Sequence, residues 1–80
     1  MKSLLLFTLS LCQAEWIRCL TAGVTDVDAT VTGCRNEGLE AHADKCLLYT
    51  KVPRDEEFCS AKAAAVCGSS NPKDFSCSDV

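Results

Sequence analysis

The sequence is poor in the residues from which most enzyme sites and nucleic-acid surfaces are built. It has one histidine, one tryptophan and one tyrosine in 80 residues, and its eight Lys and Arg residues stand singly among eleven Asp and Glu residues. Binding to phosphates depends on clustered basic side chains, which release counterions on contact. The net charge of −3 therefore describes an acidic chain for which nucleic acid and anionic membrane surfaces are poor partners.

Long apolar runs are also missing, and the one short run has the pattern of a secretory signal peptide. Lys2 supplies the positive charge, Leu4–Leu11 the apolar stretch, and Cys12–Ala14 a small-x-small cleavage site. A membrane span needs roughly 20 apolar residues, so no membrane anchor is expected. Cleavage after Ala14 removes Cys12 and leaves an even set of cysteines, as secreted proteins favour, whereas cleavage after Ala22 leaves an odd set. We expect a signal peptide at residues 1–14.

The rest of the chain, residues 15–80, is expected to be a single secreted domain and a monomer. Its cysteines are spread almost evenly: Cys19, Cys34, Cys46, Cys59, Cys67 and Cys77. A domain of this size buries only about 60% of its unfolded surface, so disulfides, each contributing about 2–4 kcal/mol, are needed to stabilise it. Zinc sites use closer cysteine pairs than any in this domain. We expect all six to form disulfides, and spacing does not choose among the 15 possible pairings.

Residue patterns predict a strand, a helix, two strands, a helix and a strand. They cover residues 16–21, 25–34, 39–42, 45–50, 53–67 and 75–78. Two helices packed on one face of a four-stranded antiparallel sheet would bury the apolar sides of all these elements. The expected fold class is therefore α+β, a disulfide-stapled βαββαβ two-layer sandwich.

The two helices are predicted with different strength. Residues 25–34 alternate apolar and polar side chains, as a strand does, yet Val27 and Val31 recur at helical spacing. Thr25 and Asp28 have the spacing of a capping box, while β-branched residues oppose a helix. The pattern therefore favours a helix here only slightly.

The clearest prediction is the second helix, residues 53–67. Pro53 suits a first helical position, and Asp55–Glu57 place negative charge in the first turn, where the helix dipole favours it. Gly68 directly after Cys67 is a typical stop.

Two groups of polar residues are candidates for chemistry. His42 and Glu40 lie on the same side of a strand and could form an acid–base dyad, and Asp55–Glu57 could act as glycosidase or metal-binding carboxylates. Polar residues on an outer strand face and first-turn acids explain both groups without chemistry. We therefore expect no catalytic, cofactor-binding or metal site, and no enzyme.

Aromatic residues supply candidate contact positions. Tyr49, Lys51, Arg54 and Phe58 could form a small contact patch, since strand ends and loops often carry recognition. Trp16 is expected to pack at the edge of the sheet.

The cysteine pattern also resembles a known family. The chain is similar to the alpha subunit of the smut-fungus killer toxin called killer protein six, and to small secreted fungal effectors that share its fold. The resemblance rests on Cys19–Gly23, Ala29–Cys34, Ala41–Leu47, Phe58–Cys67 and Phe75–Ser78. It implies the βαββαβ sandwich and a helix over residues 25–34. The toxin subunit differs in having eight cysteines and in being released at dibasic sites, which this sequence lacks.

The expected function is surface recognition of a host or competitor protein in the extracellular space, as a non-enzymatic, effector-like fungal virulence protein. The alternative is a killer-type antimicrobial toxin acting on competing microbial cells. Membrane attack is typical of basic amphipathic helices, whereas the second helix begins with acidic residues. A third hypothesis, an extracellular hydrolase, depends on Glu40 and His42 alone.

Overall fold

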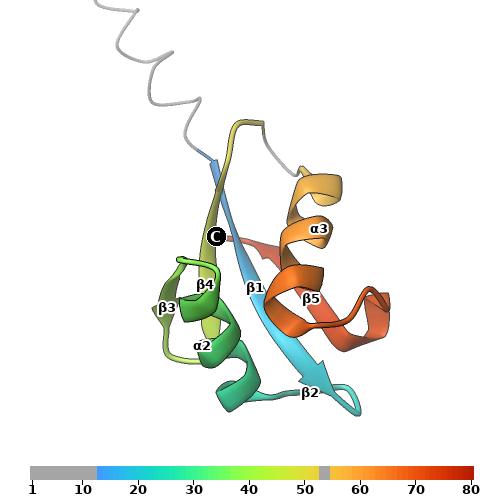
Figure 1. Ribbon diagram of the computed structural model, residues 1–80. Coiled ribbons are helices and arrows are strands. Elements are labelled where there is room, and N and C mark those ends of the chain that lie inside the picture. Colours follow the sequence, from blue (N-terminus) through green and yellow to red (C-terminus); the bar gives the residue numbers. More distant parts are fainter. Residues whose placement is uncertain (1–12, 53–54) are drawn as a thin grey trace, which may run out of the picture.

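Strand β1, Gln13–Thr21, lies at the centre of an antiparallel sheet (Figure 1). The computed structural model describes residues 13–52 and 55–80. On one side β1 pairs with β5, Phe75–Asp79, and on the other side it pairs with β4, Lys45–Thr50. The predicted strands at the two ends of the domain are therefore neighbours in the sheet.

Two short strands complete the sheet. Strand β3, Glu40–His42, pairs with the outer side of β4, which gives the order β5–β1–β4–β3. Strand β2, Val24–Thr25, folds back on the end of β1 across Ala22 and Gly23, whose φ angles are +53° and +79°. The sequence patterns did not predict β2, because so short a strand carries no alternation of its own.

Helix α2, Val27–Asn36, settles the stretch for which the sequence fitted both a helix and a strand. Its N-cap is Asp26, whose carboxylate accepts a hydrogen bond from the Ala29 amide at 3.1 Å. The predicted capping box of Thr25 and Asp28 is therefore wrong. Thr25 is the last residue of β2, and Asp26 is the residue at which the chain turns from that strand into the helix.

Thr30 explains why this β-branched segment is helical. Its side chain is fully buried, and its hydroxyl accepts a hydrogen bond from the Cys19 amide and donates one to the Asp26 carbonyl, both at 2.8 Å. A buried backbone amide without a partner is costly, so the bond to Cys19 favours the conformation that brings Thr30 under β1. Tertiary contacts thus outweigh the weak helix propensity of the segment.

Helix α3, Glu56–Cys67, begins and ends at the kinds of residue that the sequence indicated. Asp55 is its N-cap and accepts a hydrogen bond from the Phe58 amide at 3.1 Å. Gly68 closes it in the left-handed conformation, with φ of +67°. The predicted start at Pro53 lies outside the described residues.

Both helices cover the same face of the sheet, and this confirms the predicted α+β architecture (Figure 1). Helix α2 packs on β4 and β1, α3 packs on β1 and β5, and the helices touch each other where Gly33 meets Val66. The layer between helices and sheet is small and rich in sulfur. Its buried apolar members are Ile17, Cys19, Cys34, Cys46, Leu48, Cys59, Ala63, Val66 and Phe75.

Three disulfides connect the helices to the sheet. The pairs are Cys19–Cys67, Cys34–Cys46 and Cys59–Cys77. Each joins one helix to one strand, with Cα–Cα distances of 5.5, 5.7 and 6.4 Å, inside the usual range for disulfides. Cysteine spacing alone did not predict which residues pair. In the structure, every disulfide crosses the interface between the helices and the sheet.

The predicted signal peptide, residues 1–14, overlaps the start of β1. Residues 1–12 lie outside the described part of the chain, and the last two residues of the signal pair with Tyr49 and Thr50. Cleavage after Ala14 would remove these two pairs and leave the rest of β1 intact. Within residues 13–52 and 55–80, no helix has the length and apolar character to cross a membrane.

Candidate functional site

The six cysteines predicted to form disulfides have a structural role. Because their sulfurs are bonded in pairs, they offer neither a nucleophilic thiolate nor a metal ligand. Among the described residues, Glu15, Cys59 and Cys77 are the group whose potential ligand atoms lie within 4.8 Å of one another. The two sulfurs of this group form one disulfide, so it is not a metal site.

The predicted dyad of His42 and Glu40 does form, on the sheet face that the helices leave uncovered. His42 Nε2 lies 3.0 Å from Glu40 Oε2, and both side chains are largely exposed. The imidazole also meets the Trp16 ring edge to face at 5.4 Å, and Lys45 Nζ lies 4.3 Å from the centre of that ring. Trp16 is thus on a central strand rather than at the sheet edge, and the dyad is part of an exposed surface cluster.

The three side chains of the predicted acidic run, Asp55–Glu57, lie in three different places. Asp55 caps α3, as its position at the helix start favours. Glu57 is exposed on the helix surface, while Glu56 lines a hollow between α3 and the sheet. The three carboxyl groups therefore do not form one glycosidase-like or metal-binding cluster.

A hollow of about 440 Å³ lies beside α3, next to the residue at which β3 begins. Its walls come from the chain before β3, from the first residue of β3, from β4 and from α3: Gly38, Leu39, Glu40, Leu47, Leu48, Tyr49, Phe58 and Lys62. Tyr49 is 67% exposed and Phe58 44%. Because Cys46, Leu48 and Thr50 are buried under the helices, the Tyr49 side chain points to the uncovered face of the sheet, whereas Phe58 of α3 lies on the helix side of the same edge. We call this site the aromatic hollow. Of the predicted contact patch it joins Tyr49 and Phe58, whereas Lys51 does not line it and Arg54 lies outside the described residues.

Within residues 13–52 and 55–80, strand β4 has an unpaired edge next to the aromatic hollow. β3 pairs only with Lys45–Leu47, while Leu48–Thr50 continue beyond it and stay paired with β1 on their other side. The chain before β3 turns away from β4, because the Leu39 amide donates to the Cys34 carbonyl at the end of α2, at 2.8 Å. A strand edge of this kind presents backbone N–H and C=O groups that another strand can bond.

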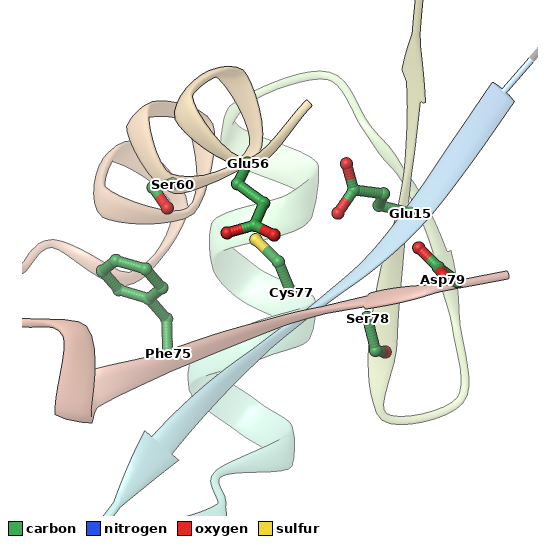
Figure 2. Close-up of a pocket in the computed structure, with 7 residues that line it drawn as sticks. All are labelled: Glu15, Glu56, Ser60, Phe75, Cys77, Ser78 and Asp79. Carbon is green, nitrogen blue, oxygen red and sulfur yellow. The ribbon is translucent and has the colours of Figure 1, made fainter. Parts of the chain in front are cut away.

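A second hollow, of about 430 Å³, lies on the other side of α3, between that helix and strands β1 and β5 (Figure 2). Carboxyl groups from three elements line it: Glu15 of β1, Glu56 of α3 and Asp79 of β5. Figure 2 shows the Glu15 and Glu56 carboxyls pointing into the space between the helix and the sheet, with the Phe75 ring and Ser60 at its other end. We call this site the acidic hollow.

Glu15 has an unfavourable environment for a carboxylate. The residue is 3% exposed, and its Oε2 atom has no hydrogen-bond partner among the described residues. Asp79 lies directly opposite on β5, where like charges repel. Burial above all, and then the negative charges of Asp79, Asp55 and Glu56, raise the pKa of the Glu15 carboxyl above its ordinary value of 4.5.

The residue patterns did not predict the acidic hollow, although part of the signal was present. Glu15 has the same strand parity as Ile17 and Cys19, which face the helices, but the predicted strand began one residue too late to include it. Asp79 fell just beyond the predicted last strand. The helix dipole explained why an acidic residue occurs at Glu56, but it does not indicate which element the Glu56 side chain faces.

No family model, no curated protein and no solved structure matches this chain. The resemblance to the killer toxin subunit and to fungal effectors therefore stays a prediction.

Proposed function

We propose that this protein is a secreted, non-enzymatic, effector-like protein that recognises an extended segment of a host or competitor protein at the aromatic hollow. One observation carries the proposal: the exposed rings of Tyr49 and Phe58 flank the β4 edge at Leu48–Thr50 from the two faces of the sheet, and no described residue pairs with that edge. An edge and an adjacent hollow are the two parts that strand addition requires.

The free edge supplies the backbone part of this recognition. A partner segment that continues the line of β3 would bond to the N–H and C=O groups of Leu48–Thr50 on their unpaired side. So short an edge offers few hydrogen bonds, each with a net contribution of only about 0.5–1.5 kcal/mol. Most of the affinity therefore has to come from side chains.

The aromatic hollow supplies the side-chain part. Tyr49 and Phe58 offer large contact areas at a low cost in conformational entropy, and aromatic residues are enriched at the energetic centres of interfaces. The charged residues at its rim already have partners, since Glu40 pairs with His42 and Lys62 lies 3.9 Å from Glu37. An apolar side chain of the partner is therefore the best occupant.

The disulfides hold both walls of the aromatic hollow before anything binds. Cys34–Cys46 ties β4 to α2, and Cys59–Cys77 ties the first half of α3 to β5. A preformed site loses less entropy on binding than one that must order itself. Three disulfides in a small domain are also compatible with the oxidising environment outside the cell.

A double variant, Tyr49→Ser with Phe58→Ser, tests the proposal. Both side chains are exposed, so the fold should persist while affinity for the partner falls at least about tenfold. The matched control is Val24→Ser with Val27→Ser, which removes two exposed apolar side chains near β2 and should change affinity less than about twofold. The partner would be captured from host extracellular fluid on the immobilised wild-type protein, and its binding then measured with each variant.

Hydrogen exchange gives a second measurement of the same site. On partner binding, exchange of the backbone amides in Leu48–Thr50 should slow, because the added strand covers that edge. Equal binding by both double variants would contradict the proposed site. If the wild-type protein and the Tyr49→Ser/Phe58→Ser variant inhibit microbial cultures equally at micromolar concentration, the killer-type toxin replaces the effector-like function.

A further inference from the structure

The acidic hollow gathers the side chains of Glu15, Glu56 and Asp79 around one space of about 430 Å³. We propose that it binds a guanidinium group, the side chain of an arginine that another protein presents. The inference does not depend on the function of the aromatic hollow, which lies on the other side of α3.

Glu15 is the first reason to expect a cation. An ionised carboxylate is expensive to bury unless a positive group or hydrogen-bond donors satisfy it. Glu15 is 3% exposed, its Oε2 atom has no hydrogen-bond partner in the described chain, and Asp79 faces it across the sheet. A cation in the hollow would bond the unsatisfied Oε2 atom of Glu15.

The spacing of the carboxylates favours an organic cation over a metal ion. Calcium ligands lie about 2.3–2.6 Å from the ion, so their oxygens must converge closely. In the described residues, the group that converges within 4.8 Å combines Glu15 with two disulfide sulfurs and includes neither Glu56 nor Asp79. A guanidinium spreads five N–H donors over a planar fork and can bond carboxylates that stand apart.

The wall of the hollow favours a guanidinium over an ammonium group. Phe75, held in the core at 9% exposure, presents part of its ring to the hollow, and the Ser60 hydroxyl lies nearby as an acceptor. Guanidinium groups stack on aromatic faces and are weakly hydrated, whereas an ammonium is a compact, strongly hydrated charge. An arginine side chain therefore suits the acids and the ring together.

The raised pKa of Glu15 also fits a cationic ligand. Burial and the charges of Asp79, Asp55 and Glu56 raise the pKa of Glu15, while a bound cation favours its ionised form. Binding should therefore release protons, and affinity should rise as the pH increases from 4.5 towards 7.5.

The experiment uses the oxidised full chain, labelled with ¹⁵N, so that Glu15 keeps the residues before it in β1 and therefore its backbone amide. The probe is N-acetyl-arginine methylamide, and the neutral citrulline analogue of the same shape is the control ligand. The arginine probe should shift the amide resonances of Glu15, Glu56 and Asp79 in a saturable manner, with a Kd on the order of 1 mM for a single side chain. The citrulline analogue should leave them unchanged.

Three substitutions locate the binding. Glu15→Gln and Glu56→Gln should each weaken the arginine probe about tenfold, because each removes one charge-assisted hydrogen bond. Glu57→Gln removes the same charge from the same turn of α3 but does not line the hollow, so it should change affinity less than about twofold. The Tyr49→Ser/Phe58→Ser variant should bind the probe normally, which separates this site from the aromatic hollow.

Several results would overturn the proposal. The first is the absence of saturable shifts with the arginine probe, and the second is equal shifts with the citrulline analogue. The third is equal affinity for the lysine analogue of the same probe, and the fourth is an equal effect of Glu15→Gln and Glu57→Gln on affinity. Saturable shifts of the same amides with calcium chloride, lost in Glu15→Gln, would replace the guanidinium site with a metal site.

Discussion

Thr30 and Glu15 are both buried polar residues, and their environments differ in one respect. The hydroxyl of Thr30 has a donor and an acceptor partner, each at 2.8 Å, whereas the Oε2 atom of Glu15 has none among the described residues. Satisfied buried groups fix a fold, and unsatisfied ones reduce its stability. Residues that conflict with the fold in this way are concentrated at binding sites, which is why Glu15 is of interest.

Glu15 should make the protein less stable as the pH rises. Because its pKa is higher in the folded protein than in the unfolded chain, the folded state binds more protons between pH 4.5 and that raised pKa. The free energy of unfolding therefore falls through this window, and the full penalty is present above it. Glu15→Gln does not titrate, so it should be the more stable protein at pH 7.5, by about 1–3 kcal/mol.

Urea denaturation of the wild type and Glu15→Gln at pH 4 and pH 7.5 checks this prediction. The stability difference should be small at pH 4 and should grow towards pH 7.5. Glu57→Gln, at an exposed position in the same region, should follow the wild type at both pH values. A difference that does not change with pH would contradict the assignment.

At the scale of elements, α3 could be predicted from the sequence and α2 only in part. Every signal of α3 is local: acids in the first turn, a run of alanines and Gly68 at the end. The helical state of α2 depends on contacts distant in sequence, above all the bond between Thr30 and the Cys19 amide. The two hollows could not be predicted, because they depend on where β3 begins relative to β4 and on what α3 faces on each side.

The contact between α2 and α3 leads to a prediction at this scale. Replacing glycine by alanine inside a helix usually stabilises it by about 1 kcal/mol. At Gly33 the sign should reverse, because a Cβ there would overlap the Val66 backbone carbonyl and force the helices apart. We expect Gly33→Ala to lower the free energy of unfolding by about 1–3 kcal/mol, the usual cost of overpacking.

Urea denaturation again provides the measurement, and Thr32→Ala provides the control. Thr32 is an exposed position of the same helix, so alanine there should be neutral or slightly stabilising. If Gly33→Ala proved as stable as Thr32→Ala, the two helices could not be packed as closely as they are here.

At the scale of the whole molecule, stability depends on the disulfides more than on the apolar interior. Few large apolar side chains are fully buried, and cysteines make up much of the core. Three disulfides at about 2–4 kcal/mol each are comparable with the total stability of a typical domain, about 5–15 kcal/mol.

Reduction should therefore unfold the protein. Far-ultraviolet circular dichroism at 37 °C should show loss of helix and sheet in excess dithiothreitol, and mass spectrometry after alkylation should show the disulfide thiols labelled only in the reduced sample. Retention of the native spectrum with all these thiols labelled would contradict the dependence on crosslinks. Heating to the same temperature without reductant is the control.

The bridge between Cys19 and Cys67 has one more consequence, for the response of the protein to proteolysis. The other two bridges each stay on one side of the connection between β4 and α3, while this one spans it. A protease that cuts this connection should leave the two parts linked by the Cys19–Cys67 disulfide, with β5 still paired with β1. Separating the two parts by proteolysis then requires a second event, either another cut or cleavage of this disulfide.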